Sequence, residues 1–156
     1  MTKNTANYVK MDLLGKPKGW DRSGQNGKWH YDTKKNTEMK AAIRILAQTE
    51  FEKRGINLPI PAGMAGYSIC IEAYFVPPKS TTKKQRYYIA NLDCLPKCKP
   101  DIDNIAKLWL DALVSGGIIE DDKNVVFLGV KKFYSESEHM TCSIKWIDDP
   151  EEQANG

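Results

Sequence analysis

Six carboxylates and three lysines lie close together in residues 99–124, which read KPDIDNIAKLWLDALVSGGIIEDDKN. Carboxylates held at close range repel one another, so such a group is stable only when some are protonated or a cation lies between them. Magnesium prefers carboxylate oxygens and water, can hold a substrate phosphate, and can activate a water for hydrolysis. The stretch therefore predicts metal-assisted chemistry on a phosphate ester.

The spacing of these residues suggests how they meet. Asp103 and Lys107 are four residues apart and share a helical face, with Asp101 at the start of the helix. Asp121 and Asp122 follow a Gly-Gly turn, after which the chain can fold back toward the first helical turn. The Lys107 ammonium would offset the charge that a phosphate gains in the transition state. Each feature alone also has a structural explanation, because Asp caps helices and occurs in turns.

The distribution of charge favours the functional explanation over the structural one. The net charge is +3, but residues 1–35 carry eight Lys/Arg against three Asp, and residues 79–99 carry six against one. Two basic segments that flank an acidic cluster suggest a polyanion held near a metal site. The residues expected to contact phosphates are Lys16, Lys18, Arg22, Lys28, Lys83, Lys84 and Arg86.

Hydrophobic periodicity predicts the elements that position these residues. The expected order is strand, helix, strand, helix, strand, strand, at residues 8–14, 37–54, 66–78, 101–115, 124–134 and 140–147. The last two are predicted to form an antiparallel pair joined by the turn SESEH. Without the regular alternation of a doubly wound sheet, this order indicates an α+β fold, a small mixed or antiparallel sheet with two main helices.

The remaining segments are predicted from composition and pattern. Residues 15–31 are expected to form a mobile loop and residues 79–99 an exposed basic segment with at most a short helical turn. In the 101–115 helix, Leu108, Leu110 and Ala112 widen the apolar stripe beyond one face, so the helix should pack on two sides, with a second subunit as the candidate partner.

The chain is predicted to be one domain, residues 1–147, followed by an acidic, disordered tail at 148–156. It has no apolar run long enough to span a membrane and no apolar signal segment, so a cytoplasmic location is expected. Cytosolic thiols stay reduced, so disulfides are not expected. Zinc at Cys94 and Cys98 would need a second ligand pair of similar spacing, which the sequence lacks.

The motif KPDIDNIAKLWLDAL, followed by a glycine turn and EDDKNVV, resembles that of the RusA-type Holliday junction resolvases of bacteria and phages. The resemblance implies a small homodimer that uses magnesium, or manganese in its place, to cut paired strands of four-way DNA junctions. By position, it makes Asp101, Asp103 and Asp122 the catalytic metal ligands, Asp121 a further candidate ligand, and Lys107 the catalytic lysine.

The predicted function is therefore a crossover junction endodeoxyribonuclease of recombination and repair in a bacterial or phage-infected cell, whose two-fold symmetry would suit a two-fold substrate. Two alternatives stay open: a nuclease for flaps and forks, and a non-catalytic DNA-binding accessory protein, although the intact acidic set argues against the latter. Asp111 is expected only to pair with Lys107. The aromatic residues near the basic segments would either stack on unpaired bases or anchor loops: Trp20, Trp29, Tyr87 and Tyr88.

Overall fold

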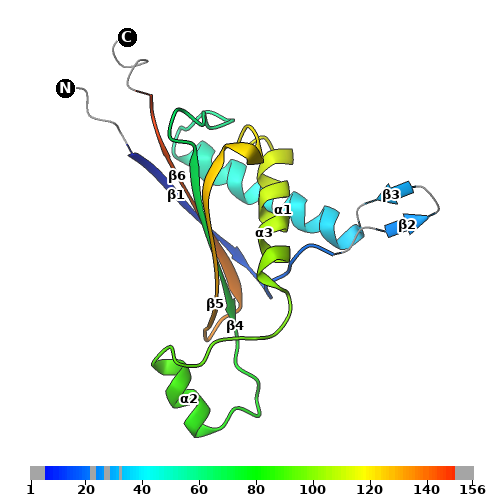
Figure 1. Ribbon diagram of the computed structural model, residues 1–156, viewed down its shortest axis with the longest axis vertical. Coiled ribbons are helices and arrows are strands. Elements are labelled where there is room, and N and C mark those ends of the chain that lie inside the picture. Colours follow the sequence, from blue (N-terminus) through cyan, green and yellow to red (C-terminus); the bar gives the residue numbers. More distant parts are fainter. Residues whose placement is uncertain (1–5, 22–23, 27–28, 32, 150–156) are drawn as a thin grey trace.

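A computed structural model describes residues 6–21, 24–26, 29–31 and 33–149. It contains a four-stranded sheet in the order β1-β6-β4-β5 and a separate two-stranded sheet, β2-β3. The long helices α1 and α3 lie on one side of the larger sheet, whereas α2 and the β2-β3 hairpin project from the body (Figure 1). The fold is α+β, as predicted. Its elements are β1 (Ala6–Leu14), β2 (Gly24–Asn26), β3 (Trp29–Tyr31), α1 (Lys34–Lys53), β4 (Tyr67–Phe75), α2 (Lys83–Ala90), α3 (Ile102–Ser115), a 3-10 turn η1 (Asp122–Asn124), β5 (Val125–Tyr134) and β6 (His139–Ile147).

One face of the larger sheet forms the floor of the core. In β4, Ile69 and Ile71 belong to the buried alternate positions, while Cys70 between them is exposed. The register aligns Ile69 with Ile144 of β6, and Ile144 in turn with Val9 of β1. Since alternate residues of a strand point to the same face, these side chains make one continuous apolar layer on which the helices pack.

The order of the strands corrects the predicted pairing of the last two. β4 lies between β5 and β6, parallel to the first and antiparallel to the second. The connection crosses the end of β4, where the N–H of Ser135 donates to the carbonyl of Phe75 at 2.8 Å. The turn sequence thus predicted the reversal of direction correctly, but a reversal does not determine which strand becomes the neighbour.

Helix α3 packs on two sides within a single chain. Leu108, Trp109 and Ala112 are fully buried, and the Trp109 indole N–H points at the sulfur of Met140 on the sheet side at 3.5 Å. On the other side lies α1, whose Gln48 side chain donates to the carbonyl of Gly116 at 3.3 Å. Within one chain, α1 and the sheet therefore cover much of the wide apolar stripe, and Leu110 stays half-buried at the pocket beside β5.

The basic segment before α3 contains more helix than predicted. Thr82 accepts from the N–H of Gln85 at 3.1 Å, and the Gln85 side chain accepts from the N–H of Thr82 at 2.9 Å. This capping box starts α2, and no side chain of α2 is buried. The segment is largely exposed and basic as expected, and the T-x-x-Q sequence at its start is the local signal for the helix.

Three further predictions concern the chain as a whole. No helix in the described part of the chain has the length and apolar character needed to cross a bilayer. All four cysteines belong to the described residues and are unpaired thiols. Asp149, assigned by prediction to the tail, accepts from the N–H of Met64 at 2.8 Å; residues 150–156 lie outside the described residues.

Candidate active site and nucleic-acid interface

Asp101 occupies the N-cap position of α3 but does not act as a cap. Its backbone is extended and its carbonyl accepts from the N–H of Ile105 at 3.0 Å, yet its side chain makes no capping hydrogen bond to a described residue. Thr33, by contrast, caps α1 by accepting from the N–H of Asn36 at 3.2 Å. Capping therefore does not explain the aspartate here, and its exposed carboxylate is available to a ligand.

An acidic pocket forms between α3 and the start of β5. Its volume is about 780 Å³, and its lining includes Asp103, Lys107 and Asp111 of α3 together with Asp122 of η1. The chain does fold back after the Gly-Gly turn and brings Asp122 to the helix. Asp111 lines the same pocket, so its place extends beyond the predicted pairing with Lys107. We call this site the acidic pocket.

Asp121 and Asp122, at the start of η1, have opposite pKa shifts. The N–H of Lys123 donates to Asp121 at 3.1 Å, which lowers the pKa of Asp121. The pKa of Asp122 is raised, chiefly by a hydrogen bond with the Asp121 side chain and further by repulsion from Asp121 and Asp111. The two neighbouring carboxylates thus influence each other's pKa, and a cation bound between them would reduce their repulsion.

The predicted metal ligands do not all line the same pocket. Asp103 and Asp122 line the acidic pocket, whereas Asp101 lines a neighbouring one. Within the residues described by the structure, no three Asp, Glu, His or Cys side chains are close enough together to hold a metal. Two carboxylates still fit magnesium, because that ion is commonly held by one or two carboxylates and completes its shell with water and substrate phosphates.

Trp20 supports the predicted catalytic lysine, a role that the sequence did not reveal. The Lys107 ammonium nitrogen lies 4.6 Å from the centre of the Trp20 ring, and that of Lys40 lies 5.4 Å from it. The backbone N–H of Trp20 donates to the carbonyl of Asn104 in α3 at 2.8 Å. Of the two roles expected for Trp20, loop anchoring is the one observed. No local motif could signal this contact, because the two residues are distant in sequence.

The predicted phosphate-binding residues fall into three places. Lys16 and Lys18 line the pocket beside Asp101. Lys83, Lys84 and Arg86 lie exposed on α2, which is well separated from α3 in Figure 1. Arg22 and Lys28 lie outside the described residues, and no side chain is described for Trp29. Among the predicted residues that the structure describes, only the first pair lies next to an acidic residue of the site.

The α+β fold thus places the acidic pocket beside a group of lysines. A family model described as endodeoxyribonuclease RusA matches residues 15–145, a span that includes the loop before α1 and the whole of α3. This chain belongs to the RusA endodeoxyribonuclease family, which confirms the resemblance seen in the motif. It is also 33% identical over 136 residues to the uncharacterized protein YqaN of Bacillus subtilis (strain 168), covering 85% of this chain and 88% of that one.

Proposed function

We propose that this protein is a magnesium-dependent, structure-selective endonuclease that resolves four-way DNA junctions in recombination and repair. Membership of the RusA family supports the endonuclease activity on DNA. The observation that carries the hydrolytic role is the acidic pocket, in which Asp103, Lys107 and Asp122 meet. Manganese is expected to replace magnesium, and the protein is expected to act in the cytoplasm of a bacterial or phage-infected cell.

Each residue of the site has a distinct task in this proposal. Asp103 and Asp122 would hold the metal, with Asp101 and Asp121 as the neighbouring carboxylates within the same charged region. When bound, the ion would activate a water and offset charge on the scissile phosphate. Lys107, held against the ring of Trp20, stabilises the negative charge that develops on that phosphate.

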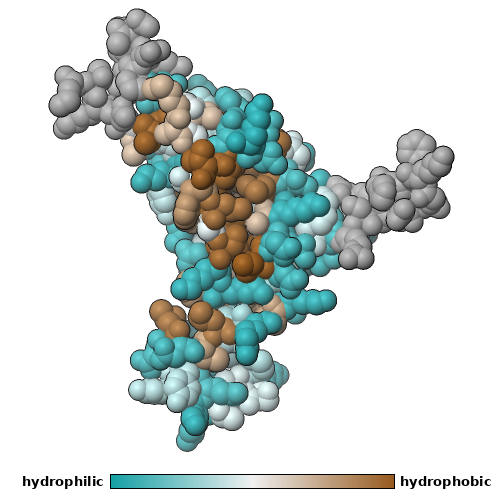
Figure 2. Space-filling view, in the orientation of Figure 1, coloured by the Kyte–Doolittle hydropathy of each residue, from teal (hydrophilic) through white to brown (hydrophobic). Residues whose placement is uncertain are grey.

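We propose further that the active form is a homodimer. β5 is the terminal strand of the larger sheet, and its Val126, Phe127 and Leu128 are 67%, 55% and 38% exposed. They expose both faces of this edge, because Leu128 pairs with the buried Ile69 on the helix side and Phe127 pairs with Ser68 on the other. An apolar area lies over β5 and α3 in Figure 2, beside the acidic pocket that Leu128 also lines. Exposed apolar patches of this kind mark interaction surfaces. A second copy on this patch would bring two acidic pockets together for paired cuts.

The proposal is tested by incubating the protein with a mobile four-way junction, a flap and a plain duplex, each with magnesium and with chelator. Symmetric nicks on the junction, dependent on the metal, are the expected result. Equal cutting of the flap would instead indicate a nuclease for branched DNA in general. Tight junction binding without any cutting would indicate an accessory protein.

A single substitution connects this activity to the acidic pocket. Asp103→Asn should slow cleavage about 100-fold or more, as expected for the loss of a metal ligand, while junction binding survives. Asp93→Asn removes the same charge from an exposed residue outside the acidic pocket and serves as the control. Cleavage by Asp103→Asn at the parental rate would show that the metal site has been assigned to the wrong residues.

A further inference from the structure

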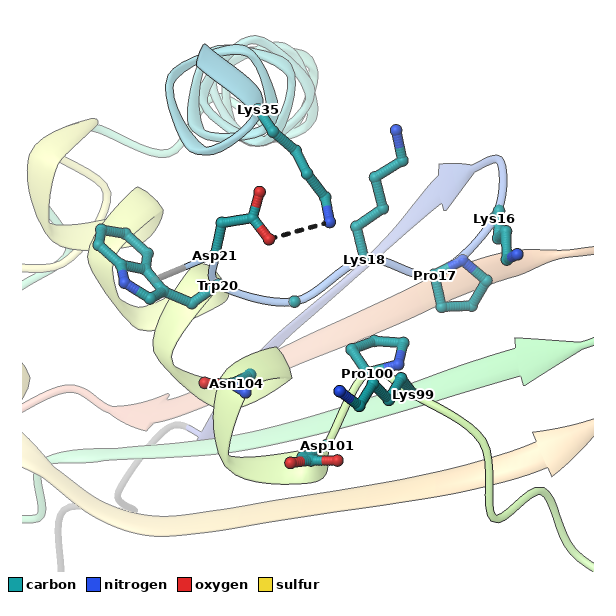
Figure 3. A pocket seen from close by; sticks show the side chains of 11 residues that line it. Lys16, Pro17, Lys18, Trp20, Asp21, Lys35, Lys99, Pro100, Asp101 and Asn104 are labelled. Atoms are coloured by element: carbon teal, nitrogen blue, oxygen red, sulfur yellow. Dashed lines mark hydrogen bonds and ion pairs between the residues drawn. The ribbon is translucent and has the colours of Figure 1, made fainter. Parts of the chain in front are cut away.

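A second concave site lies on the other side of the start of α3 and has a volume of about 390 Å³. Figure 3 shows the loop of residues 16–21 running between Lys35 of α1 and the segment that contains Pro100 and Asp101. Lysines from three separate parts of the chain line it: Lys16, Lys18, Lys35 and Lys99. Lys35 and Lys99 were not among the residues predicted to contact DNA. We call this site the lysine pocket.

The wall of the lysine pocket is fixed to both helices. A Cβ added to Gly19 would lie 2.8 Å from the Cβ of Pro100, so the loop backbone touches the start of α3. The fully buried Asn36 of α1 accepts from the N–H of Asp21 at 2.8 Å and donates to the carbonyl of Asp21 at 2.9 Å. With the bond from Trp20 to Asn104, the loop is held at three successive residues. The predicted mobility of the loop is therefore wrong for residues 19–21.

The charge of the lysine pocket is positive, with four lysines against two aspartates. Asp21 approaches Lys35 at 3.4 Å, so these two charges largely offset each other. Lys16, Lys18 and Lys99 remain, and the other carboxylate in the described lining is Asp101, which lies near the proposed metal. An exposed, concave group of lysines suits an anion that keeps part of its hydration, and phosphate is the anion that the DNA substrate supplies.

The two pockets meet at the first turn of α3. Asp101 lines the lysine pocket and Asp103, two residues later, lines the acidic pocket. A DNA strand lying across this turn would present one phosphate to each. We propose that the lysine pocket binds one backbone phosphate of the strand being cut, next to the scissile phosphate, and so sets the position of the strand. This inference rests on the proposed function, because it takes the acidic pocket as the place of cleavage.

The experiment scans junctions that carry a single methylphosphonate, which removes one phosphate charge, at successive positions around the cut. For the parent protein, one position beside the cut should show the largest loss of affinity. In Lys16→Gln/Lys99→Gln this loss should disappear, because the pocket no longer distinguishes the charged phosphate from the neutral one. The slope of log affinity against log salt should also fall by about 0.9, the value for one lost phosphate contact.

The matched control is Lys34→Gln/Lys145→Gln. Lys34 precedes Lys35 on α1 but is 88% exposed and near Glu38, and Lys145 is exposed on β6, so the pair removes the same charge outside the lysine pocket. This variant should keep the parental loss at the critical phosphate. If both double variants still lose affinity when the critical phosphate is neutralised, the lysine pocket binds no phosphate, even though the parent cuts junctions. If the parent neither binds nor cuts branched DNA, the proposed function fails and the inference fails with it.

Discussion

At the scale of single residues, Asp101 is expected to contribute to activity but little to the stability of the fold. Because its side chain makes no cap to a described residue, Asp101→Ala should change the free energy of unfolding by less than about 0.5 kcal/mol while slowing junction cleavage about 100-fold. Thr33→Ala, which removes a cap that is made, should cost about 1 kcal/mol and leave cleavage intact. Urea denaturation and single-turnover cleavage measure both effects. A large loss of stability in Asp101→Ala would restore a structural role for this residue.

Trp20 is predicted to act on the rate of cleavage through Lys107. Trp20→Leu removes the ring beside the ammonium group, and should slow single-turnover cleavage about fivefold, equivalent to the roughly 1 kcal/mol of such a contact. Junction affinity should change little. Trp20→Phe keeps an aromatic face and should recover part of the rate. If Phe and Leu are equally slow, the ring does not position the lysine.

At the scale of elements, α3 carries the residues of the acidic pocket, and the helix is held in place by its buried face. Ile105 is fully buried, whereas Ile45 on α1 is 60% exposed. Ile105→Ala should therefore cost about 2–5 kcal/mol in urea denaturation, and Ile45→Ala less than about 1 kcal/mol. Equal costs would mean that α3 is not held by the core described above.

The elements also show which features of the fold could be predicted from the sequence. Helical spacing in residues 101–115 and alternation in β4 could be recognised because each pattern is set by which positions of one element are buried. The place of β4 between β5 and β6 could not be predicted in this way, since strand pairing depends on the whole sheet. The contact of Gly19 with Pro100 was also hidden, because a glycine-rich segment has the same composition whether mobile or packed. The acidic residues were found because their chemistry is local to one motif.

At the scale of the whole molecule, three degrees of burial distinguish the thiols: Cys142 is buried, Cys94 is half-buried, and two others are exposed. Cys142 is fully buried, and burial raises the pKa of its thiol, so the reactive thiolate is scarcer than in an ordinary cysteine. Cys70 and Cys98 are exposed. A thiol reagent at pH 8 should therefore label these two rapidly in the native protein, with Cys142 labelled only after denaturant is added. Mass spectrometry of the labelled peptides distinguishes the sites, and early labelling of Cys142 would contradict its burial.

The proposed dimer is tested at the edge strand beside the acidic pocket. Val126→Glu/Phe127→Glu would place like charges opposite each other across a two-fold interface, where they cannot be desolvated without cost. The parent should sediment as a dimer at micromolar concentration, whereas this variant should be a folded monomer that no longer makes paired cuts.

Tyr8→Glu/Leu14→Glu is the matched control, since both residues are exposed on β1 at the opposite edge of the sheet. This variant should remain a dimer. If it dissociates and the β5 variant does not, the second copy binds at the β1 edge and the two acidic pockets are not brought together through β5. A parent that is monomeric under these conditions would remove the dimer but not the chemistry of the acidic pocket, because Asp103, Lys107 and Asp122 meet within one chain.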